Sequence, residues 1–235
     1  MKFPLPLRRA TLVRRYKRFL SDHLLESGES VIAHCANPGA MTGLDAAGAE
    51  TWLAPVTSPT AKLPFRWEMM RVNRALVGIN TQAANPVAEE AVRANLIPEL
   101  VGYTSLRREV RYGTNSRIDL LLEDDARRPC YVEVKNVHLR RAENAEFPDA
   151  VTKRGTKHMA ELATTAEDGA RAVLLFVVQR EDCTAFNLAD DIDPTYAAAF
   201  ADARARGVEA LCYCCKLETD SIDLHRAIPI VAREP

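Results

Sequence analysis

Two neighbouring stretches decide the fold: Ser116-Arg117-Ile118-Asp119-Leu120-Leu121-Leu122 and Cys130-Tyr131-Val132-Glu133-Val134-Lys135-Asn136-Val137. Both are rich in apolar and β-branched residues, which predicts two β-strands. The link between them, residues 123–129, is polar and typical of a turn. We therefore expect a β-hairpin in which each strand carries charged residues in the middle of its apolar sequence.

The charged residues of this hairpin converge if it folds symmetrically about Ala126. Asp119 then lies opposite Glu133, with the two Cβ atoms roughly 5 Å apart. Lys135 projects from the same face as Glu133, because side chains alternate along a strand. Two facing carboxylates repel each other unless a cation lies between them, and oxygen ligands favour Mg²⁺ or Mn²⁺. The pattern predicts a metal site with Lys135 beside it, able to bind a phosphate or to orient an attacking water.

This order of an aspartate, a spacer and Glu133-Val134-Lys135 resembles the PD-(D/E)xK nuclease superfamily. Ile118 stands where that superfamily often has proline. A Glu-x-Lys triplet is also typical of a solvated strand face. On these residues alone, both interpretations stay open.

Length and composition are those of an ordinary globular protein. The chain has 235 residues, 47% of them apolar and 27% charged, with a net charge of −1. Such a length suits one large domain or two small ones. The charge is uneven, since residues 1–20 hold seven lysines and arginines and no acid.

We expect a cytoplasmic protein without a membrane span. The longest apolar run, Ala172–Val178, is far below the roughly 20 residues that a spanning helix needs. The basic N-terminus lacks the apolar core of a signal peptide. The six cysteines show no disulfide-like spacing. Cys212, Cys214 and Cys215 are interpreted as small core residues of a strand.

Residues 1–82 are predicted to form a small β domain. Short apolar–polar runs are separated by turn residues, and five of them are expected to be strands: Ala10–Leu20, Ser30–Cys35, Glu50–Val56, Phe65–Asn73 and Leu76–Ile79. Five short strands suit an OB-fold-like barrel, a fold that commonly binds nucleic acid. A small β-sandwich would fit the composition equally well.

Two features of this domain concern ligands. Four cations, Arg14, Arg15, Lys17 and Arg18, alternate with Tyr16 and Phe19. We interpret the cations as nucleic-acid-binding, because no acid lies near them in the sequence, and the aromatic residues as core. The second feature is the loop 34–43, which could cradle a phosphate but which we interpret as a structural turn, with His34 in a supporting role.

Residues 83–235 are predicted to form an α/β domain with a mixed sheet flanked by helices. Asn85-Pro86 is a candidate helix start, with Asn85 as the cap of a helix over 87–95. Glu90 lies on the inward stripe of that helix and could supply a third carboxylate. Glu89 is the neighbouring alternative, which periodicity separates only weakly.

Later elements complete that sheet. A basic loop over 138–146 leads to a helix that runs to about residue 166, and its entry carries Lys153, Arg154, Lys157 and His158 as cationic donors. A buried, parallel-type strand is expected over 170–179. A helix over 194–206 follows, ended by Gly207, and two last strands are expected over 208–217 and 221–224.

Several separate motifs together resemble the bacterial sugar fermentation stimulation protein A family. The motifs are Arg14-Arg15-Tyr16-Lys17-Arg18-Phe19-Leu20, His34-Cys35-Ala36-Asn37-Pro38-Gly39-Ala40-Met41, Ser116-Arg117-Ile118-Asp119, Glu133-Val134-Lys135, Phe147-Pro148-Asp149-Ala150-Val151-Thr152, Arg154-Gly155 and Lys157-His158. The resemblance spans nearly the whole chain. Pro38 stands where the family usually has threonine.

The resemblance implies an N-terminal OB-like domain, a C-terminal nuclease-like domain, non-specific DNA binding and a regulatory role in sugar (maltose) metabolism. It marks Glu90, Asp119, Glu133 and Lys135 as the active-site set, with Asp119, Glu133 and Glu90 as ligands of Mg²⁺ or Mn²⁺. Two functions follow: a metal-dependent nuclease acting on DNA or RNA, and a non-catalytic DNA-binding regulator. A small-molecule-binding protein of sugar pathways is a third, weaker hypothesis. The oligomeric state is open, and a homodimer is compatible with the sequence.

Overall fold

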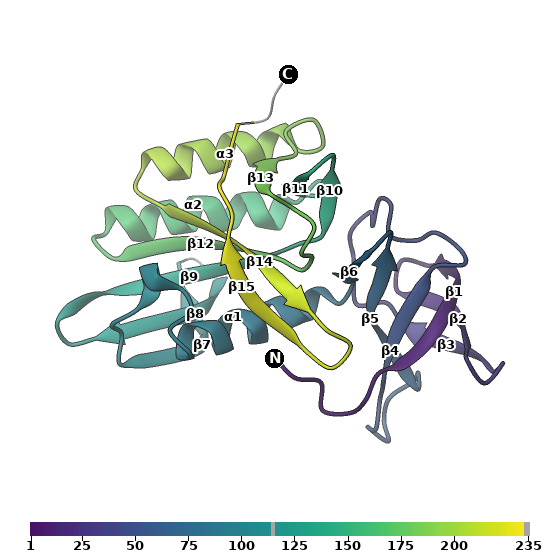
Figure 1. Ribbon diagram of the computed structural model, residues 1–235. Coiled ribbons are helices and arrows are strands. Elements are labelled where there is room, and N and C mark those ends of the chain that lie inside the picture. Colours follow the sequence, from purple (N-terminus) through teal and green to yellow (C-terminus); the bar gives the residue numbers. More distant parts are fainter. Residues whose placement is uncertain (114–115, 233–235) are drawn as a thin grey trace.

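The computed structural model describes residues 1–113 and 116–232 and shows two β-rich bodies side by side (Figure 1). The N-terminal body is a small barrel. The C-terminal body is a six-stranded mixed sheet with helices on both faces. Both expected architectures are therefore confirmed.

The N-terminal body is a closed barrel of five strands, to which a sixth strand is added. The six strands are β1 (Arg8–Tyr16), β2 (Leu20–Leu25), β3 (Ser30–His34), β4 (Glu50–Pro55), β5 (Phe65–Val72) and β6 (Ala75–Gly78). They pair in the order β3-β2-β1-β4-β5-β6, and an additional parallel pairing of β3 with β5 closes the barrel. Closure distinguishes the OB-like barrel from the sandwich that the composition also allowed.

One expected strand of the barrel is in fact two. The run Ala10–Leu20 breaks at Lys17 and Arg18, whose φ angles of 47° and 65° are left-handed. These residues form the turn between β1 and β2, and the chain continues as a strand to Leu25. In β2, the buried residues that alternate along the strand are polar, namely Ser21 and His23. A pattern search for apolar residues does not find such a strand.

The C-terminal sheet has the order β15-β14-β12-β9-β8-β7. Its strands are β7 (Ser105–Tyr112), β8 (Ser116–Asp124), β9 (Arg127–Val137), β12 (Arg171–Val178), β14 (Glu209–Leu217) and β15 (Ile222–Ala227). The central strand β12 pairs in parallel with both β9 and β14 and is buried along nearly its whole length. This confirms the expectation of a fully buried parallel strand over 170–179.

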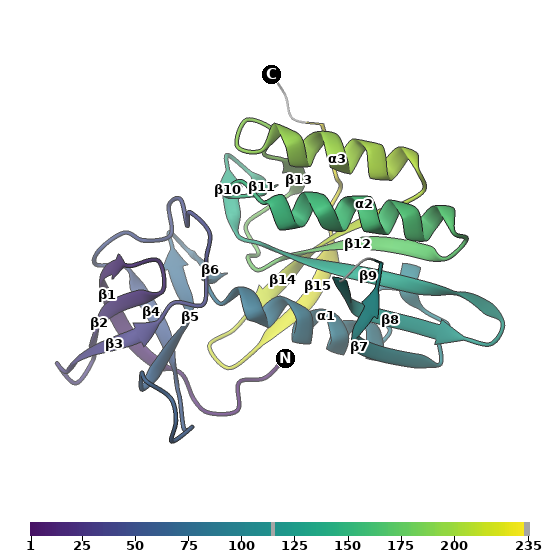
Figure 2. The same ribbon diagram turned by 180° about the vertical axis from the view of Figure 1, so that it is seen from behind.

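Helices cover both faces of this sheet (Figure 2). They are α1 (Ala84–Arg93), α2 (Lys153–Glu167) and α3 (Pro194–Ala205), with short 3₁₀ turns η1 (Thr81–Ala83) and η2 (Pro98–Leu100). Helix α1 packs on the face that carries Leu120, Val132 and Val134. Helices α2 and α3 pack on the opposite face.

We expected a loop over the basic segment 138–146, but most of this segment forms strands. It contributes β10 (Leu139–Arg141) and β11 (Asn144–Phe147), which join β13 (Ala185–Leu188) in a small separate sheet. The pairing of β11 with β13 is parallel and links residues about 40 positions apart. Short polar strands of this kind depend on such distant partners, which local patterns do not show.

The start of α1 differs from the expectation that Asn85 is its cap. Asn80 takes the capping role for the preceding 3₁₀ turn, since its side chain accepts a hydrogen bond from the backbone N–H of Gln82. The helix then begins at Ala84, three residues earlier than expected. Asn85 therefore lies inside the first helical turn, and its side chain is free to reach the sheet.

The six cysteines are all buried and free, which confirms Cys212, Cys214 and Cys215 as core residues. Cys212 and Cys214 pack on the α2 side of the sheet, and Cys215 packs on the α1 side. None of the helices in the described ranges is long and apolar enough to cross a membrane.

Candidate active site

The candidate site forms where β8 and β9 separate. Their ladder begins with Asp124 opposite Arg127 and shifts by one position at a bulge. It then pairs Leu122 with Cys130 and Leu120 with Val132, which is the register expected for a hairpin folded about Ala126. The ladder does not continue to Asp119. Instead, the Asp119 carboxylate accepts a hydrogen bond from the backbone N–H of Val134, at 2.8 Å from Oδ2. An acidic side chain thus replaces a backbone acceptor at the point where the two strands part.

Asp119 is held from two sides. Its Oδ2 binds β9, and its Oδ1 accepts a hydrogen bond of 2.7 Å from Nδ2 of Asn85 on α1. Burial raises the pKa of Asp119, and the nearby charge of Glu133 raises it further. The raised pKa shows that the negative charge is costly here, which is the electrostatic effect that a bound cation relieves.

Glu133 is buried, and only one of its carboxylate oxygens has partners. Oε1 accepts hydrogen bonds from Nζ of Lys135, at 2.6 Å, and from the ring of His158 on α2. Burial raises the pKa of Glu133, but the His158 hydrogen bond and the Lys135 charge outweigh this, so the pKa lies below its usual value. Oε2 is buried and has no hydrogen-bond partner in the described part of the chain.

Two further buried groups lie next to these carboxylates. The Tyr112 hydroxyl and both carboxylate oxygens of Glu161 make no hydrogen bond within the described ranges. Burial raises the pKa of Tyr112 well above its usual value, and the charges of Glu133, Glu161 and Asp119 add to this. All three carboxylates therefore act electrostatically on this hydroxyl. Glu161 belongs to α2, and Lys157 Nζ lies 3.5 Å from its Oε1.

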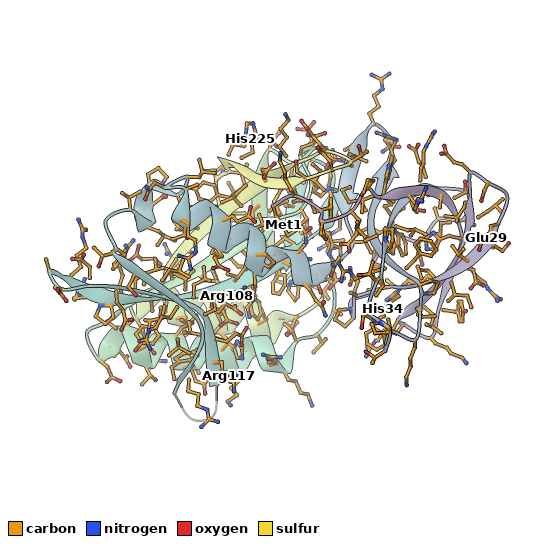
Figure 3. All side chains as sticks on the ribbon, turned by 90° about the horizontal axis from the view of Figure 1, so that it is seen from below. Met1, Glu29, His34, Arg108, Arg117 and His225 are labelled. Carbon is orange, nitrogen blue, oxygen red and sulfur yellow. The ribbon has the colours of Figure 1, made fainter. Side chains whose placement is uncertain are left out.

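The structure does not bring Glu90 to this cluster. Its side chain is 59% exposed and pairs at 2.8 Å with the amino group of Met1, which lies beside α1 in Figure 3. Asn85 marks the face of α1 that meets Asp119, and Glu90 is five positions further on, so it projects from a different face. Glu89, four positions on from Asn85, shares that face but pairs with Arg93 and Arg108.

The donors at this site fit a divalent metal through two carboxylates. Within residues 1–113 and 116–232, no three His, Cys, Asp or Glu side chains form a complete metal-binding group. Mg²⁺ does not need one, because it keeps several waters and is often held by one or two carboxylates together with substrate phosphates. The two carboxylates here are Glu133, whose Oε2 has no partner among the described residues, and Asp119, whose negative charge is costly at this position.

The cations expected to bind nucleic acid lie in two places. On the barrel, Lys17 and Arg18 form the exposed β1–β2 turn. Arg15 donates to the carbonyls of Asn37 and Gly39 and so supports the loop behind that turn. Arg14 departs from our expectation of an unneutralised cation, because it pairs with Asp22 at 2.7 Å.

We expected both aromatic residues of that motif, Tyr16 and Phe19, to be core residues, and for Phe19 this is wrong. Phe19 is 43% exposed, and its ring packs against His34, with 6.4 Å between the ring centroids. The guanidinium of Arg14 lies 4.9 Å from the centre of the Tyr16 ring. The pairing of Leu20 with both Tyr16 and His34 places these rings on one side of the barrel. Of these rings, Phe19 is exposed and Tyr16 is half-buried.

The second group of cations lies at the start of α2. Lys153 and Arg154 occupy its first turn, and Arg154 Nε donates to His158 Nε2 at 3.4 Å. Lys157 projects one turn later. These cations stand on the helix that also supplies His158 and Glu161 to the site, which places basic donors next to the carboxylates.

Sequence reasoning did not assign three residues to this site: Asn85, Glu161 and His158, of which His158 was interpreted only as a cationic donor at the start of the helix. His158 had a signal, because it closes one of the motifs that carry the family resemblance. Glu161 lies one turn after His158 on the buried side of α2, which helical spacing indicates. Asn85 was interpreted as a cap, and only the earlier helix start shows its other role.

The fold and the site together define a class: a two-domain protein in which an OB-like barrel precedes an α/β domain with a buried pair of carboxylates. A model of the sugar fermentation stimulation protein RE domain matches residues 82–221, and a model of the SfsA N-terminal OB domain matches residues 13–79. The chain belongs to the sugar fermentation stimulation protein family.

Similar proteins cover the whole chain. A sugar fermentation stimulation protein homolog of Paramagnetospirillum magneticum is 55% identical over 95% of both chains. The homolog of Maricaulis maris is 52% identical over 98% of both. A solved structure, that of Pyrococcus furiosus SfsA in complex with Ca²⁺, superposes with a TM-score of 0.89 at 26% identity and covers 98% of both chains.

Proposed function

We propose that this protein is a divalent-metal-dependent phosphodiesterase that acts on nucleic acid. The observation that carries the proposal is Glu133, a buried carboxylate with one oxygen held by Lys135 and His158 and the other without a partner among the described residues. A buried, unpaired acceptor costs roughly 1–3 kcal/mol, and more when it is charged. A bound cation would remove that cost.

Asp119 and Glu133 would hold Mg²⁺ or Mn²⁺, with the backbone carbonyl of Val134 as a further oxygen donor. When bound there, the ion supplies positive charge at a phosphate and lowers the pKa of a water molecule. The solved Pyrococcus furiosus relative is in complex with Ca²⁺, which supports a divalent-ion site in this family. Ca²⁺, Mg²⁺ and Mn²⁺ all take oxygen ligands.

The residues of the chain itself have separate tasks. Lys135 directs an ammonium group at the carboxylate pair and would orient a water or stabilise charge that develops on the phosphate. His158 holds Glu133 in place and keeps it ionised. Lys153 and Arg154 would bind the phosphates of the substrate strand, and the cations of the barrel would add affinity.

The test is cleavage of single- and double-stranded DNA and RNA in the presence of Mg²⁺ or Mn²⁺. We expect wild-type protein to cleave at least one of them and Glu133→Gln to lose at least about a hundredfold in rate, because charge stabilisation worth several kcal/mol is removed. Glu143→Gln, an exposed position in the turn between β10 and β11, is the control and should cleave like wild type. Equal activity of wild type and Glu133→Gln would refute the assignment.

A non-catalytic DNA-binding regulator is the second candidate, connected with the sugar metabolism that the relatives' names record. The position of Glu90 supports it, because a third acidic ligand from α1 is not brought to the site. Titration calorimetry with Mn²⁺ distinguishes the two. Binding that disappears in Asp119→Ala supports the phosphodiesterase, and absence of binding supports the regulator.

A further inference from the structure

Two of the sequence motifs that the active site does not use meet at the junction of the barrel and the α/β domain. There they enclose a cavity of about 360 Å³, which we call the junction cavity. One wall is the loop around Asn37, with Arg18 of the β1–β2 turn at its side. The other wall is the segment 147–152 that leads into α2.

Asp149 holds the two walls together. Its Oδ2 accepts hydrogen bonds from the backbone N–H of Met41, at 3.3 Å, and from Nε2 of His138, at 3.1 Å. Gly39 lies so close that a Cβ at that position would be 2.0 Å from Oδ2 of Asp149. Because only glycine allows this approach, the loop and the segment form one fixed unit rather than two surfaces that happen to be near each other.

The chemistry of the cavity differs from one end to the other. Phe147 and Val151 provide apolar surface, and Val151 is 68% exposed at the rim. Asp149 is at the inner side, with a side chain only 17% exposed. An ionised carboxylate has about four acceptor positions, and the Met41 N–H, His138 and the Asp149 backbone N–H use three of them, which leaves one for a ligand. Arg18 supplies positive charge from an exposed position at the cavity wall.

These features select a ligand of mixed character. A simple anion such as phosphate is excluded from the interior, because Asp149 would repel it. A purely apolar ligand would leave the remaining acceptor position of that carboxylate unfilled. A flat heterocycle with an amino group, joined to a phosphate, satisfies both ends: the amino group donates to Asp149, and the phosphate meets Arg18. The volume also suits it, since small-molecule sites start at about 300 Å³.

We propose that the junction cavity binds one nucleotide whose base carries an exocyclic amino group. The base enters between Phe147 and Val151, and the phosphate lies at Arg18. In this proposal, which rests on the proposed function, the nucleotide belongs to the bound nucleic acid strand. The turn between the first two strands is one of the loops with which OB-folds contact oligonucleotides, which agrees with this placement.

The position of the cavity relative to the carboxylates supports a strand that occupies both. Thr152 lines the cavity and caps α2, and His158, six residues later, contacts Glu133. Six residues of helix correspond to roughly 9 Å. That length is about three steps of a stacked strand at 3.4 Å each. A nucleotide held in the cavity would therefore fix which phosphate, a few steps away, lies at Asp119 and Glu133.

The test compares two oligonucleotides of equal length and charge, dC10 and dU10: cytosine carries a C4 amino group and an N3 acceptor, whereas uracil carries a C4 carbonyl and an N3–H, so only cytosine offers an exocyclic amino group to Asp149. Dissociation constants are measured by fluorescence anisotropy in EDTA, so that no cleavage occurs. We expect wild-type protein to bind dC10 about tenfold more tightly, the usual worth of one hydrogen bond to a charged group. Ala150→Leu, which fills the cavity, should remove this preference. Ala201→Leu on the exposed face of α3 is the matched control and should keep it.

A second variant covers the case in which Ala150→Leu fails to fold. Asp149→Asn keeps an acceptor for Met41 N–H but offers an amino group to the base, so it should lower or reverse the preference for dC10. Melting temperatures of all variants establish that they are folded. Equal binding of dC10 and dU10 by wild type, or a preference unchanged in both cavity variants, would overturn the proposal.

The ligand is either a nucleotide within a bound strand or a free nucleotide, and titration with free nucleotides distinguishes these two sources. Titration calorimetry with CMP and UMP shows whether the cavity takes a nucleotide outside a strand. If wild type binds neither oligonucleotide, the proposed function fails; selective binding of CMP that is lost in Ala150→Leu would still establish the cavity as a nucleotide site. If CMP does not bind either, the cavity proposal fails together with the proposed function.

Discussion

At the scale of single residues, Asp119 and Glu133 differ in how their charge is supported. Glu133 has Lys135 and His158 on one oxygen, and its pKa is lowered. Asp119 has only neutral donors, Asn85 and the Val134 N–H, and its pKa is raised. The pair therefore lacks positive charge on the Asp119 side. This imbalance locates the place where a cation would be most stabilising.

Removing the charge of Asp119 should stabilise the metal-free protein. Asp119→Asn keeps an acceptor for the Val134 N–H and loses a charge that burial and Glu133 disfavour. We expect the free energy of unfolding in urea, measured at pH 7 in EDTA, to rise by about 1 kcal/mol. A gain of this size is usual when a substitution removes an unfavourable charge from a functional site. In contrast, Mg²⁺ should raise the melting temperature of wild type and leave that of Asp119→Asn unchanged.

Asp45→Asn, at an exposed position of the barrel, is the control for that experiment and should behave like wild type in both conditions. A destabilised Asp119→Asn protein in EDTA would show that the carboxylate serves the fold rather than a metal.

His23 makes the stability of the barrel depend on pH. It is fully buried between Thr51 and Ser21, and burial lowers its pKa to about 4. The unfolded chain has the ordinary value of about 6.5, so stability is present above pH 6.5 and is lost as the pH falls toward 4. At pH 5 this group should lower the free energy of unfolding by about 2 kcal/mol relative to pH 7.

Urea unfolding at pH 7 and pH 5 measures this effect. His23→Gln should be less stable at pH 7, because a fitted ring is lost, but should show a smaller difference between the two pH values. His225→Gln is the control, since His225 is exposed on β15 and is labelled in Figure 3. A pH difference as large in His23→Gln as in wild type would contradict the assignment.

At the scale of elements, the sequence predicted what local periodicity and turn residues determine. The buried strand over 170–179, helices α2 and α3 and the register of the β8–β9 hairpin follow from such patterns. The missed elements depend on distant partners. Strand β2 buries the polar residues Ser21 and His23, whose partners come from other strands of the barrel, and β10, β11 and β13 exist only as a set.

The candidate site shows the same division. Asp119, Glu133 and Lys135 belong to one hairpin, whose register at Leu120 and Leu122 could be predicted from spacing, whereas the end of the ladder before Asp119 could not. His158 belongs to α2. Asn85 belongs to α1 and contacts Asp119 because the helix begins early, directly after the turn that Asn80 caps. Their positions depend on how helices pack on the two faces of the sheet, and this is a tertiary property.

Asp193 joins the two helices on one face of the sheet. Its carboxylate accepts from the Thr152 N–H at the start of α2, at 2.8 Å, and from the Tyr196 N–H at the start of α3, at 3.0 Å. Because Asp193 is buried, Asp193→Ala leaves two buried donors unpaired and should cost about 2–3 kcal/mol. Asp193→Asn retains one acceptor and should cost about half as much.

Chemical denaturation of both Asp193 variants measures these losses. Because α2 carries His158, Asp193→Ala should also weaken any Mn²⁺ binding in proportion to the disorder of that helix. An Asp193→Ala protein as stable as wild type would show that water replaces the carboxylate at both helix starts.

At the scale of the whole molecule, the barrel and the α/β domain are joined by backbone as well as side chains. The N-terminal residues cross to the far domain, where Phe3 N–H donates to the Asp220 carbonyl. At the junction, Gly78 of β6 donates its N–H to the Gln179 carbonyl at 2.8 Å. The Gln179 side chain in turn donates to the Asn80 carbonyl. Such contacts predict that the two domains unfold together.

Gly78 is the position where this coupling can be tested. A Cβ there would lie 2.3 Å from Oε1 of the buried Gln179, so Gly78→Ala must displace Gln179 and disturb the contact between the two domains. We expect a single calorimetric transition for wild type and two separated transitions for Gly78→Ala, because the junction no longer links the domains.

Gly28→Ala is the control: nothing lies within 4 Å of its Cβ, and its φ of 85° costs only about 1 kcal/mol of backbone strain. That variant should melt earlier but in one transition. If Gly78→Ala also unfolds in one transition with the same enthalpy as wild type, the domains are coupled through contacts other than this junction, and the N-terminal crossing is the next place to look.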